Sequence, residues 1–157
     1  GVRAVPVVSA REMCDAVLSA LPEQDIIIKA AAVADYRPVE TADEKMKKKD
    51  GELTVTLERT EDILAYLGSH RRDGQFICGF SMETEHMLEN SRAKLEKKHI
   101  DMIVANNLRQ EGAGFGTDTN VVTLLTKEET LELPILSKEE VADRLLTFIL
   151  NKLGKQA

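Results

Sequence analysis

Residues 26–38, with the sequence IIIKAAAVADYRP, decide how we interpret the fold of this chain. The first part, 26–33, is a nearly unbroken apolar run, which is typical of a strand buried on both faces of an α/β sheet. Small residues and then Asp35 follow at its end. Since ligands of such sheets bind at the carboxyl ends of the strands, this strand end is a candidate binding site.

The segment before this strand has the pattern of a capped helix. Ser9 and Glu12 match the S-x-x-E capping box, and apolar residues at helical spacing follow as far as Pro22. Residues 2–8 form a short apolar run that we expect to be extended. A helix leading into a buried strand supports the α/β interpretation.

The rest of the chain continues to alternate between helical and extended patterns. The clean alternation of residues 52–59 predicts a half-buried strand, and the charged stretch 35–50 before it predicts a long loop. The remaining expected elements are helices at 61–68 and 83–98, buried strands at 76–80 and 101–106, a glycine-rich loop at 109–120, a hairpin of strands 121–126 and 130–135, and a helix after the capping box of Ser137 and Glu140.

Composition limits the class of protein. The 157 residues, 43% of them hydrophobic, are enough for one domain with a core, and the net charge of -6 argues against general nucleic-acid binding. Neither Cys14 nor Cys78 lies in a C-x-x-C pair, so we expect buried free thiols and a reducing cytoplasm. No apolar run approaches the roughly 20 residues of a membrane span. His70, His86 and His99 lie in polar segments and are expected at the surface.

Two stretches offer groups for a phosphate-bearing ligand. Ala30, Ala31 and Asp35 would let a flat ring or ribose approach the backbone, although a tightly packed strand with a capping aspartate explains them equally simply. Residues 45–49 carry four lysines in five positions, which suits a phosphate-closing lid or an ordinary solvated charge run. Neither stretch decides the function alone.

Three further features have the same double interpretation. The helix start at 60–64 could present backbone N–H groups to an anion or could be an ordinary capped start. Phe80 could stack on a base or pack in the core. Lys94 and Lys98 share one helix face and could reach a triphosphate or serve solubility. No P-loop and no G-x-G-x-x-G is present, which disfavours an NAD-dependent reductase.

The order of these segments is more specific than any one of them. AAAVADYRP, EKMKK, ELTVTLER, EDIL, GFSMET, AKLEKKHIDMIVAN and GAGFGTDTNVVTLL follow one another along nearly the whole chain. This series resembles the phosphopantothenate–cysteine ligase domain of the bacterial bifunctional coenzyme A biosynthesis protein. The resemblance implies a three-layer Rossmann-like domain with a mostly parallel sheet and a C-terminal β-hairpin extension. It also implies CTP-dependent activation of 4'-phosphopantothenate as an acyl-cytidylate, which cysteine then attacks.

The resemblance implies roles for particular residues. Lys45 would be the functional lysine of a mobile flap at about 36–51, and Asn106 would end a strand beside the site. The nucleotide would be bound by residues from five segments: Ala30, Ala31, Asp35, Lys45, Glu61, Asp62, Ile63, Leu64, Phe80, Lys94 and Lys98. The family usually has N-P where this chain has Thr60-Glu61, which loosens the loop but keeps its backbone groups.

The resemblance also implies the surroundings of the reaction. Mg²⁺ would accompany CTP, the cytoplasmic protein would be a homodimer or a higher homo-oligomer, and a flavin-dependent decarboxylase domain would be fused to it. In the family a segment with a glycine-rich loop and an asparagine precedes the position of Gly1, so we expect this chain alone to bind CTP without completing the ligation. The competing interpretation is a non-catalytic nucleotide-binding or interaction module with the same fold.

Overall fold

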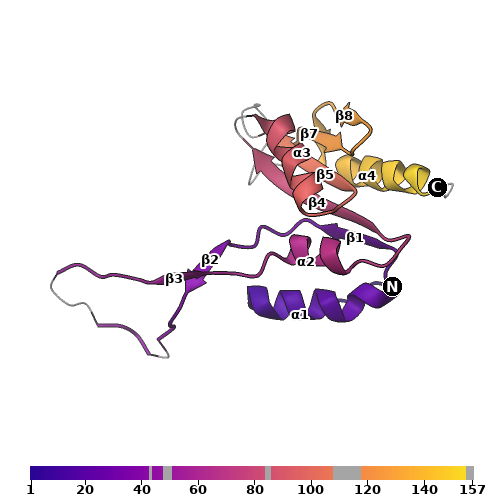
Figure 1. Ribbon diagram of the computed structural model, residues 1–157. Helices are drawn as coiled ribbons and strands as arrows, with labels where there is room; N and C mark the ends of the chain where they lie inside the picture. The colour runs from indigo at the N-terminus through magenta and orange to yellow at the C-terminus, as the bar shows by residue number, and fades with distance from the viewer. Residues whose placement is uncertain (43, 48–50, 84–85, 108–117, 155–157) are drawn as a thin grey trace.

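A computed structural model describes residues 1–42, 44–47, 51–83, 86–107 and 118–154. The elements alternate between helix and strand over most of this length, as the sequence predicts (Figure 1). The helices are α1 (Ala10–Ala20), the short 3₁₀ helix η1 (Leu21–Glu23), α2 (Ile63–His70), α3 (Met87–Lys97) and α4 (Lys138–Lys152). The strands are β1 (Ile26–Lys29), β2 (Tyr36–Pro38), β3 (Leu57–Arg59), β4 (Phe76–Glu83), β5 (Met102–Asn107), β6 (Thr119–Asn120), β7 (Val122–Leu125), β8 (Thr130–Glu132) and β9 (Leu136–Ser137).

The central sheet has five strands in the order β1-β4-β5-β7-β8. The pairs β1–β4 and β4–β5 are parallel, whereas β7 runs antiparallel to both β5 and β8. Four of the five strands therefore point the same way, and the predicted C-terminal hairpin is the pair β7–β8. The expectation of a mostly parallel sheet with a hairpin extension is confirmed.

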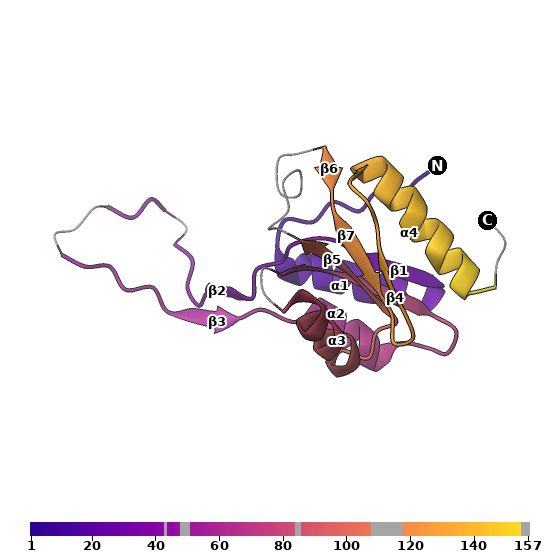
Figure 2. The same cartoon turned by 90° about the horizontal axis from the view of Figure 1, so that it is seen from above.

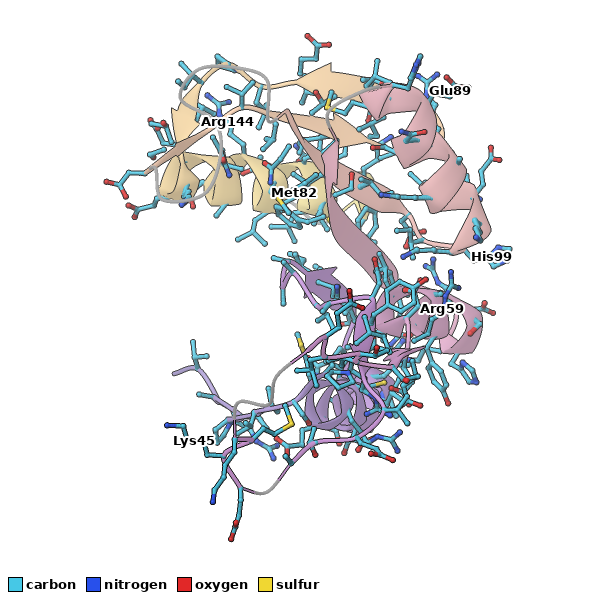
Figure 3. All side chains as sticks on the ribbon, turned by 90° about the vertical axis from the view of Figure 1, so that its left-hand side faces the viewer. Lys45, Arg59, Met82, Glu89, His99 and Arg144 are labelled. Atoms are coloured by element: carbon cyan, nitrogen blue, oxygen red, sulfur yellow. The ribbon has the colours of Figure 1, made fainter. Side chains whose placement is uncertain are left out.

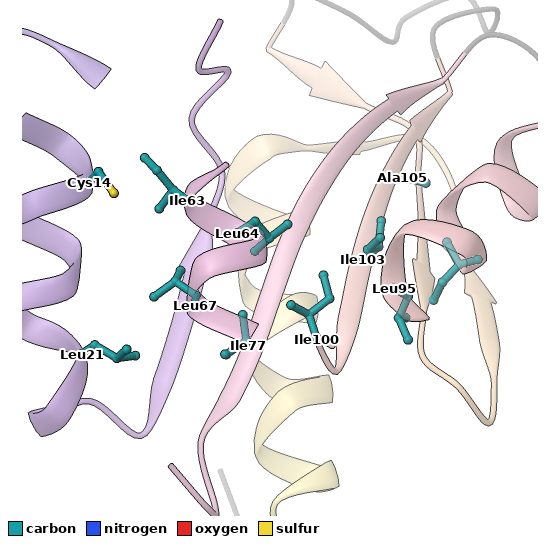
Figure 4. Close-up of a cluster of buried hydrophobic side chains, with 11 residues drawn as sticks. Cys14, Leu21, Ile63, Leu64, Leu67, Ile77, Leu95, Ile100, Ile103 and Ala105 are labelled. Carbon is teal, nitrogen blue, oxygen red and sulfur yellow. The ribbon is translucent and has the colours of Figure 1, made fainter. Parts of the chain in front are cut away.

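Helices cover both faces of this sheet, which gives three layers (Figure 2). On one face, α1, α2 and α3 pack against alternate strand residues such as Ile77 and Ile103, and Figure 4 shows this cluster. On the other face, Val141, Leu145 and Ile149 of α4 pack against Cys78 and other strand residues. The apolar side chains divide between two clusters because successive strand residues point to opposite faces.

Both predicted capping boxes are present. Ser9 accepts a hydrogen bond from the backbone N–H of Glu12 at the start of α1, and Ser137 does the same for Glu140 at α4. In each box the glutamate also accepts a bond from the backbone of the cap residue. These local patterns set the helix starts correctly.

The described residues between 36 and 59, namely 36–42, 44–47 and 51–59, form an arm that projects from the body in both Figures 1 and 2. Its strands β2 and β3 pair through Arg37 and Glu58, whose side chains also form an ion pair of 2.7 Å. The prediction of a half-buried strand over 52–59 is wrong, since only 57–59 is a strand and Leu53 is 73% exposed. The alternation is present in the sequence, but its apolar residues Leu53, Val55 and Leu57 are all more than half exposed. The loop predicted over 35–50 begins as the strand β2.

Two more expectations need correction. Residues 2–8 have no assigned strand, and Val2 and Val8 are each 97% exposed. The strand β1 is shorter than 26–33 and is not buried on both faces, because it lies at the edge of the sheet with Ile28 36% exposed. Most of the loop predicted over 109–120 lies outside the described residues. Within the described part of the chain, no helix is long and apolar enough to cross a membrane.

Candidate functional site

The start of α2 is joined to the end of α3 by a charged contact. Asp62 is the N-cap of α2 and accepts a hydrogen bond of 3.1 Å from the backbone N–H of Ala65. The Lys98 ammonium group, reaching from the C-cap of α3, lies 2.9 Å and 3.1 Å from the two carboxylate oxygens of Asp62. Two predicted nucleotide-binding residues, 36 positions apart, are therefore in direct contact.

The pKa of Asp62 is lowered by this arrangement. Partial burial works to raise the pKa, but the hydrogen bonds from Lys98 and Ala65 and the charges of Lys98 and Lys29 together outweigh it. The carboxylate is thus kept ionised between two lysines. It can hold Lys98 in place until a stronger anion competes for that ammonium group.

Lys29, which the sequence analysis did not single out, belongs to the same cluster. It is half-buried at the end of β1, and its Nζ donates a 2.9 Å hydrogen bond to the carbonyl of Ala31. Burial, followed by the charge of Lys98, lowers the pKa of Lys29. A cation inside the apolar run IIIKAAA was the sequence signal that could have identified it.

The chain after β1 exposes small residues beside this cluster. Ala30 and Ala31 are exposed, so the packed-strand alternative for them is wrong. Thr60 ties the segment to the approach of α2, since its hydroxyl donates to the carbonyl of Ala34 and its N–H donates to the carbonyl of Asp35 at 3.0 Å. Asp35 itself is exposed and contributes to the electrostatics of Lys29. A ligand can therefore approach this backbone closely.

Two other predicted residues lie on the opposite face of the sheet. Phe80 is half-buried and packs against the cluster of buried residues under α4. Asn106 pairs in register with Met82, and its Oδ1 is buried with no hydrogen-bond partner among the described residues. An unsatisfied amide oxygen is costly in a core, so it suits a position where a ligand N–H or a water completes the bond.

The remaining residues predicted at the start of α2 have structural roles. Ile63 and Leu64 are 2% and 6% exposed and belong to the core, so they can offer a ligand only their backbone. A Cβ on Gly79 would collide with the side chain of Leu64, which fixes how closely α2 packs on β4. Glu61 is exposed and bonds to Arg11 of α1 at 3.3 Å.

The two other predicted lysines are more peripheral. Lys94 is exposed on α3, one turn before Lys98. Lys45 is exposed on the arm, and Figure 3 shows it well apart from Arg59 and Met82. The structure brings Lys98 and Asp62 together with Lys29, and it leaves Lys45 outside this cluster. The predicted histidines are at the surface, as expected.

A metal would find few protein ligands here. Among the described residues, no group of three or more His, Cys, Asp or Glu side chains could hold an ion. Asp62 is engaged by Lys98, which leaves Asp35 as the other carboxylate beside the cluster.

Comparison with known proteins gives a consistent picture. Residues 1–153 match the family model described as DNA/pantothenate metabolism flavoprotein C-terminal domain. The chain is 48% identical over 143 residues to the coenzyme A biosynthesis bifunctional protein CoaBC of Bacillus subtilis (strain 168), covering 90% of this chain and 35% of that protein. It is 41% identical over 151 residues to a cysteine/cysteine sulfinic acid decarboxylase of an unknown prokaryotic organism, covering 96% of this chain and 42% of the relative.

Among solved structures, the crystal structure of the C-terminal domain of a CoaBC protein is 43% identical and superposes with a TM-score of 0.76. This match covers 96% of the present chain and 67% of that structure. The chain spans 35% and 42% of the length of the two curated relatives named above.

Proposed function

Because this chain belongs to the DNA/pantothenate metabolism flavoprotein C-terminal domain family, we propose that it is the nucleotide-binding part of a ligase in coenzyme A biosynthesis. The reaction would use CTP to activate the carboxylate of 4'-phosphopantothenate as an acyl-cytidylate and would then join it to the amine of cysteine. The relatives named CoaBC support the pathway. The resemblance of the sequence motifs supports the chemistry.

The observation that carries this proposal is the lysine and aspartate cluster at the carboxyl end of β1, between β1 and the helices α2 and α3. The Lys29 ammonium group bonds to the exposed segment of Ala30 and Ala31 at the carboxyl end of β1, and the Lys98 ammonium group acts on Lys29 from its contact with Asp62. Ligands of α/β sheets bind beside such strand ends. A carboxylate attacks the α-phosphorus, diphosphate leaves, and negative charge accumulates on the phosphate oxygens. Fixed ammonium groups stabilise that charge without reorganising during the reaction.

Phe80 and Asn106 would then contact the base. Phe80 offers a ring that is not fully buried, and the amide oxygen of Asn106 offers an acceptor for an exocyclic amine. Cytosine and adenine both carry such an amine, so the preference for CTP is supported by the family resemblance alone.

Lys45 would act from the arm. Its exposure on a projecting segment fits a group that approaches the phosphates only when the ligand is bound. Mg²⁺, when bound to the triphosphate, would neutralise part of its charge. We also propose that the full-length protein is a homodimer carrying a flavin-dependent decarboxylase domain.

The experiment is a thermal-shift comparison of CTP, ATP and NAD in the presence of Mg²⁺. We expect CTP to raise the melting temperature most, and Lys98→Met and Lys45→Ala to reduce this effect. Lys127→Met, at an exposed lysine after β7, is the matched control. Equal stabilisation by ATP would contradict the CTP preference, and no effect of any nucleotide would favour the non-catalytic module.

A further inference from the structure

Lys29 occupies an unusual position for a lysine. It is the last residue of β1, in register with Gly79 of β4, and alternation places it on the face covered by α1, α2 and α3. Its ammonium group is half-buried, and its hydrogen bond goes to the carbonyl of Ala31, only two residues along the chain. A backbone carbonyl carries no net charge and only partly compensates a desolvated cation.

The carboxylate that acts most strongly on this lysine is already paired with another lysine. Asp62 contributes to the electrostatics of Lys29, but both of its oxygens contact Lys98. Asp35, the other acidic group acting on Lys29, is exposed. Among the described residues, no carboxylate lies within ion-pair distance of the Lys29 ammonium group. The cluster thus holds two ammonium groups and one closely bound carboxylate, which pairs with Lys98.

This excess of positive charge around Lys29 and Lys98 favours the binding of an anion. The pKa of Lys29 is lowered by burial and then by the charge of Lys98, so the two cations disfavour each other in the free protein. An anion between the two ammonium groups would remove that repulsion. It would also accept hydrogen bonds from Lys29, which now donates to the carbonyl of Ala31, and from Lys98, which now pairs with Asp62. Lysine suits this role because its flexible stem can turn the ammonium group toward a phosphate.

We propose that Lys29 is a further phosphate-binding residue, which with Lys98 holds the phosphates of the nucleoside triphosphate that lie farthest from the base. The identity of the nucleotide rests on the proposed function, whereas the attraction for an anion comes from the cluster itself. Phe80, the proposed base contact, is adjacent in register but on the opposite face of the sheet. The terminal phosphates are therefore the part of the ligand that reaches Lys29.

Isothermal titration calorimetry with CTP, CMP and inorganic tripolyphosphate tests this proposal. We expect Lys29→Met to weaken the binding of CTP and tripolyphosphate by about tenfold, the loss of one charge-assisted hydrogen bond. CMP lacks the terminal phosphates, so its affinity should change by less than about twofold on the same reasoning. Lys127→Met should bind all three ligands as the unsubstituted chain does.

A second measurement needs no substitution, which covers the case that Lys29→Met does not fold. Acetylation of lysines is followed by mass spectrometry with and without tripolyphosphate. We expect Lys29 and Lys98 to be protected by the anion and Lys127 to be modified equally in both samples.

The outcomes separate this proposal from the proposed function. Unchanged binding by Lys29→Met, or unprotected Lys29, overturns the role of Lys29 while CTP binding by the unsubstituted chain still supports the ligase. Weaker tripolyphosphate binding by Lys29→Met without any preference for CTP supports Lys29 and overturns the CTP assignment. Failure of the unsubstituted chain to bind either ligand overturns both.

Discussion

Lys98 holds both carboxylate oxygens of Asp62, at 2.9 Å and 3.1 Å, and so connects the last turn of α3 to the first turn of α2. Asp62 also caps α2 through the N–H of Ala65. The Asp62 carboxylate therefore caps α2 and also holds the Lys98 ammonium group, which a ligand could then bind. Substitutions at Asp62 can separate these two roles.

The N-cap at Asp62 should stabilise the start of α2. Asp62→Ala removes both the cap and the ion pair and should lower the free energy of unfolding by about 1 kcal/mol. Asp62→Asn keeps an acceptor for Ala65 and should lose roughly half of that or less. Urea denaturation followed by circular dichroism measures both. Equal losses in the two variants would show that the charge, rather than the cap, matters.

The same residue predicts a pH dependence. The folded-state pKa of Asp62 is lowered, since the hydrogen bonds and charges outweigh its burial. The folded state therefore binds fewer protons at this carboxylate than the unfolded state does. Its contribution to stability is present above the unfolded pKa of about 4 and is lost as the pH falls through the lower folded value. The difference in unfolding free energy between the unsubstituted chain and Asp62→Asn should therefore shrink below about pH 4. A difference that grows on acidification would contradict this.

Gln75 is a buried polar residue whose removal should be expensive. It is 2% exposed, its Nε2 donates to the carbonyls of Leu21 and Gln24 at 2.7 Å and 2.6 Å, and its Oε1 accepts from the N–H of Arg72 at 2.9 Å. Gln75→Leu removes these three hydrogen bonds and leaves the N–H of Arg72 without its acceptor, while the carbonyls of Leu21 and Gln24 keep bonds from Gln24 and Arg72. The substitution should cost about 1–3 kcal/mol. Chemical denaturation measures the loss. The control Asp73→Asn, at an exposed neighbour, should change stability by less than about 0.5 kcal/mol.

Gly68 allows α2 to lie against the end of α3. A Cβ at this position would overlap the backbone carbonyl of Lys98 and come within 3.1 Å of the His99 carbonyl oxygen. Gly68→Ala should therefore destabilise the fold by about 3 kcal/mol or more, since backbone cannot easily move aside. Gly79→Ala meets the flexible side chain of Leu64 and should cost less. Thermal unfolding of the two variants gives the order, and the reverse order would contradict the packing described.

Both cysteines should be unreactive in the folded protein. Cys14 is 6% exposed and Cys78 is fully buried, and burial raises the pKa of Cys78 to about 12. A thiol reagent at pH 8 should label neither before unfolding and both after it. Because the unfolded thiol ionises near pH 8.5, stability should fall as the pH rises above that value, and Cys78→Ala should fall less steeply. Rapid labelling of the folded chain would contradict the burial.

The sequence predicted best what depends on neighbouring residues. The capping boxes of Ser9 and Ser137 lie within four residues, and both helices begin there. The alternation at residues 52–59 is equally local, but burial depends on whether another element packs against it, and Leu53, Val55 and Leu57 stay more than half exposed. Strand order has the same non-local character, which is why the edge position of β1 was missed.

The site was predictable in part for the same reason. Lys98 and Asp62 were both named in advance, but their contact spans 36 positions and needed the fold to be seen. Lys29 was overlooked because a single lysine in an apolar run resembles an interrupted strand. The roles assigned to Lys45, Phe80 and Asn106 stay predictions, because they concern a ligand.

Phe80 and Lys29 are one register step apart and face opposite sides of the sheet. Any molecule that contacts both residues must pass around the carboxyl end of β1, with a flat apolar part on one face of the sheet and an anionic part on the other. The length of a ligand should therefore affect its affinity, as its charge and shape do. A nucleoside without phosphates, or a free phosphate, can contact only one face of the sheet. Neither gains the added affinity that comes from linking the two contacts in one molecule.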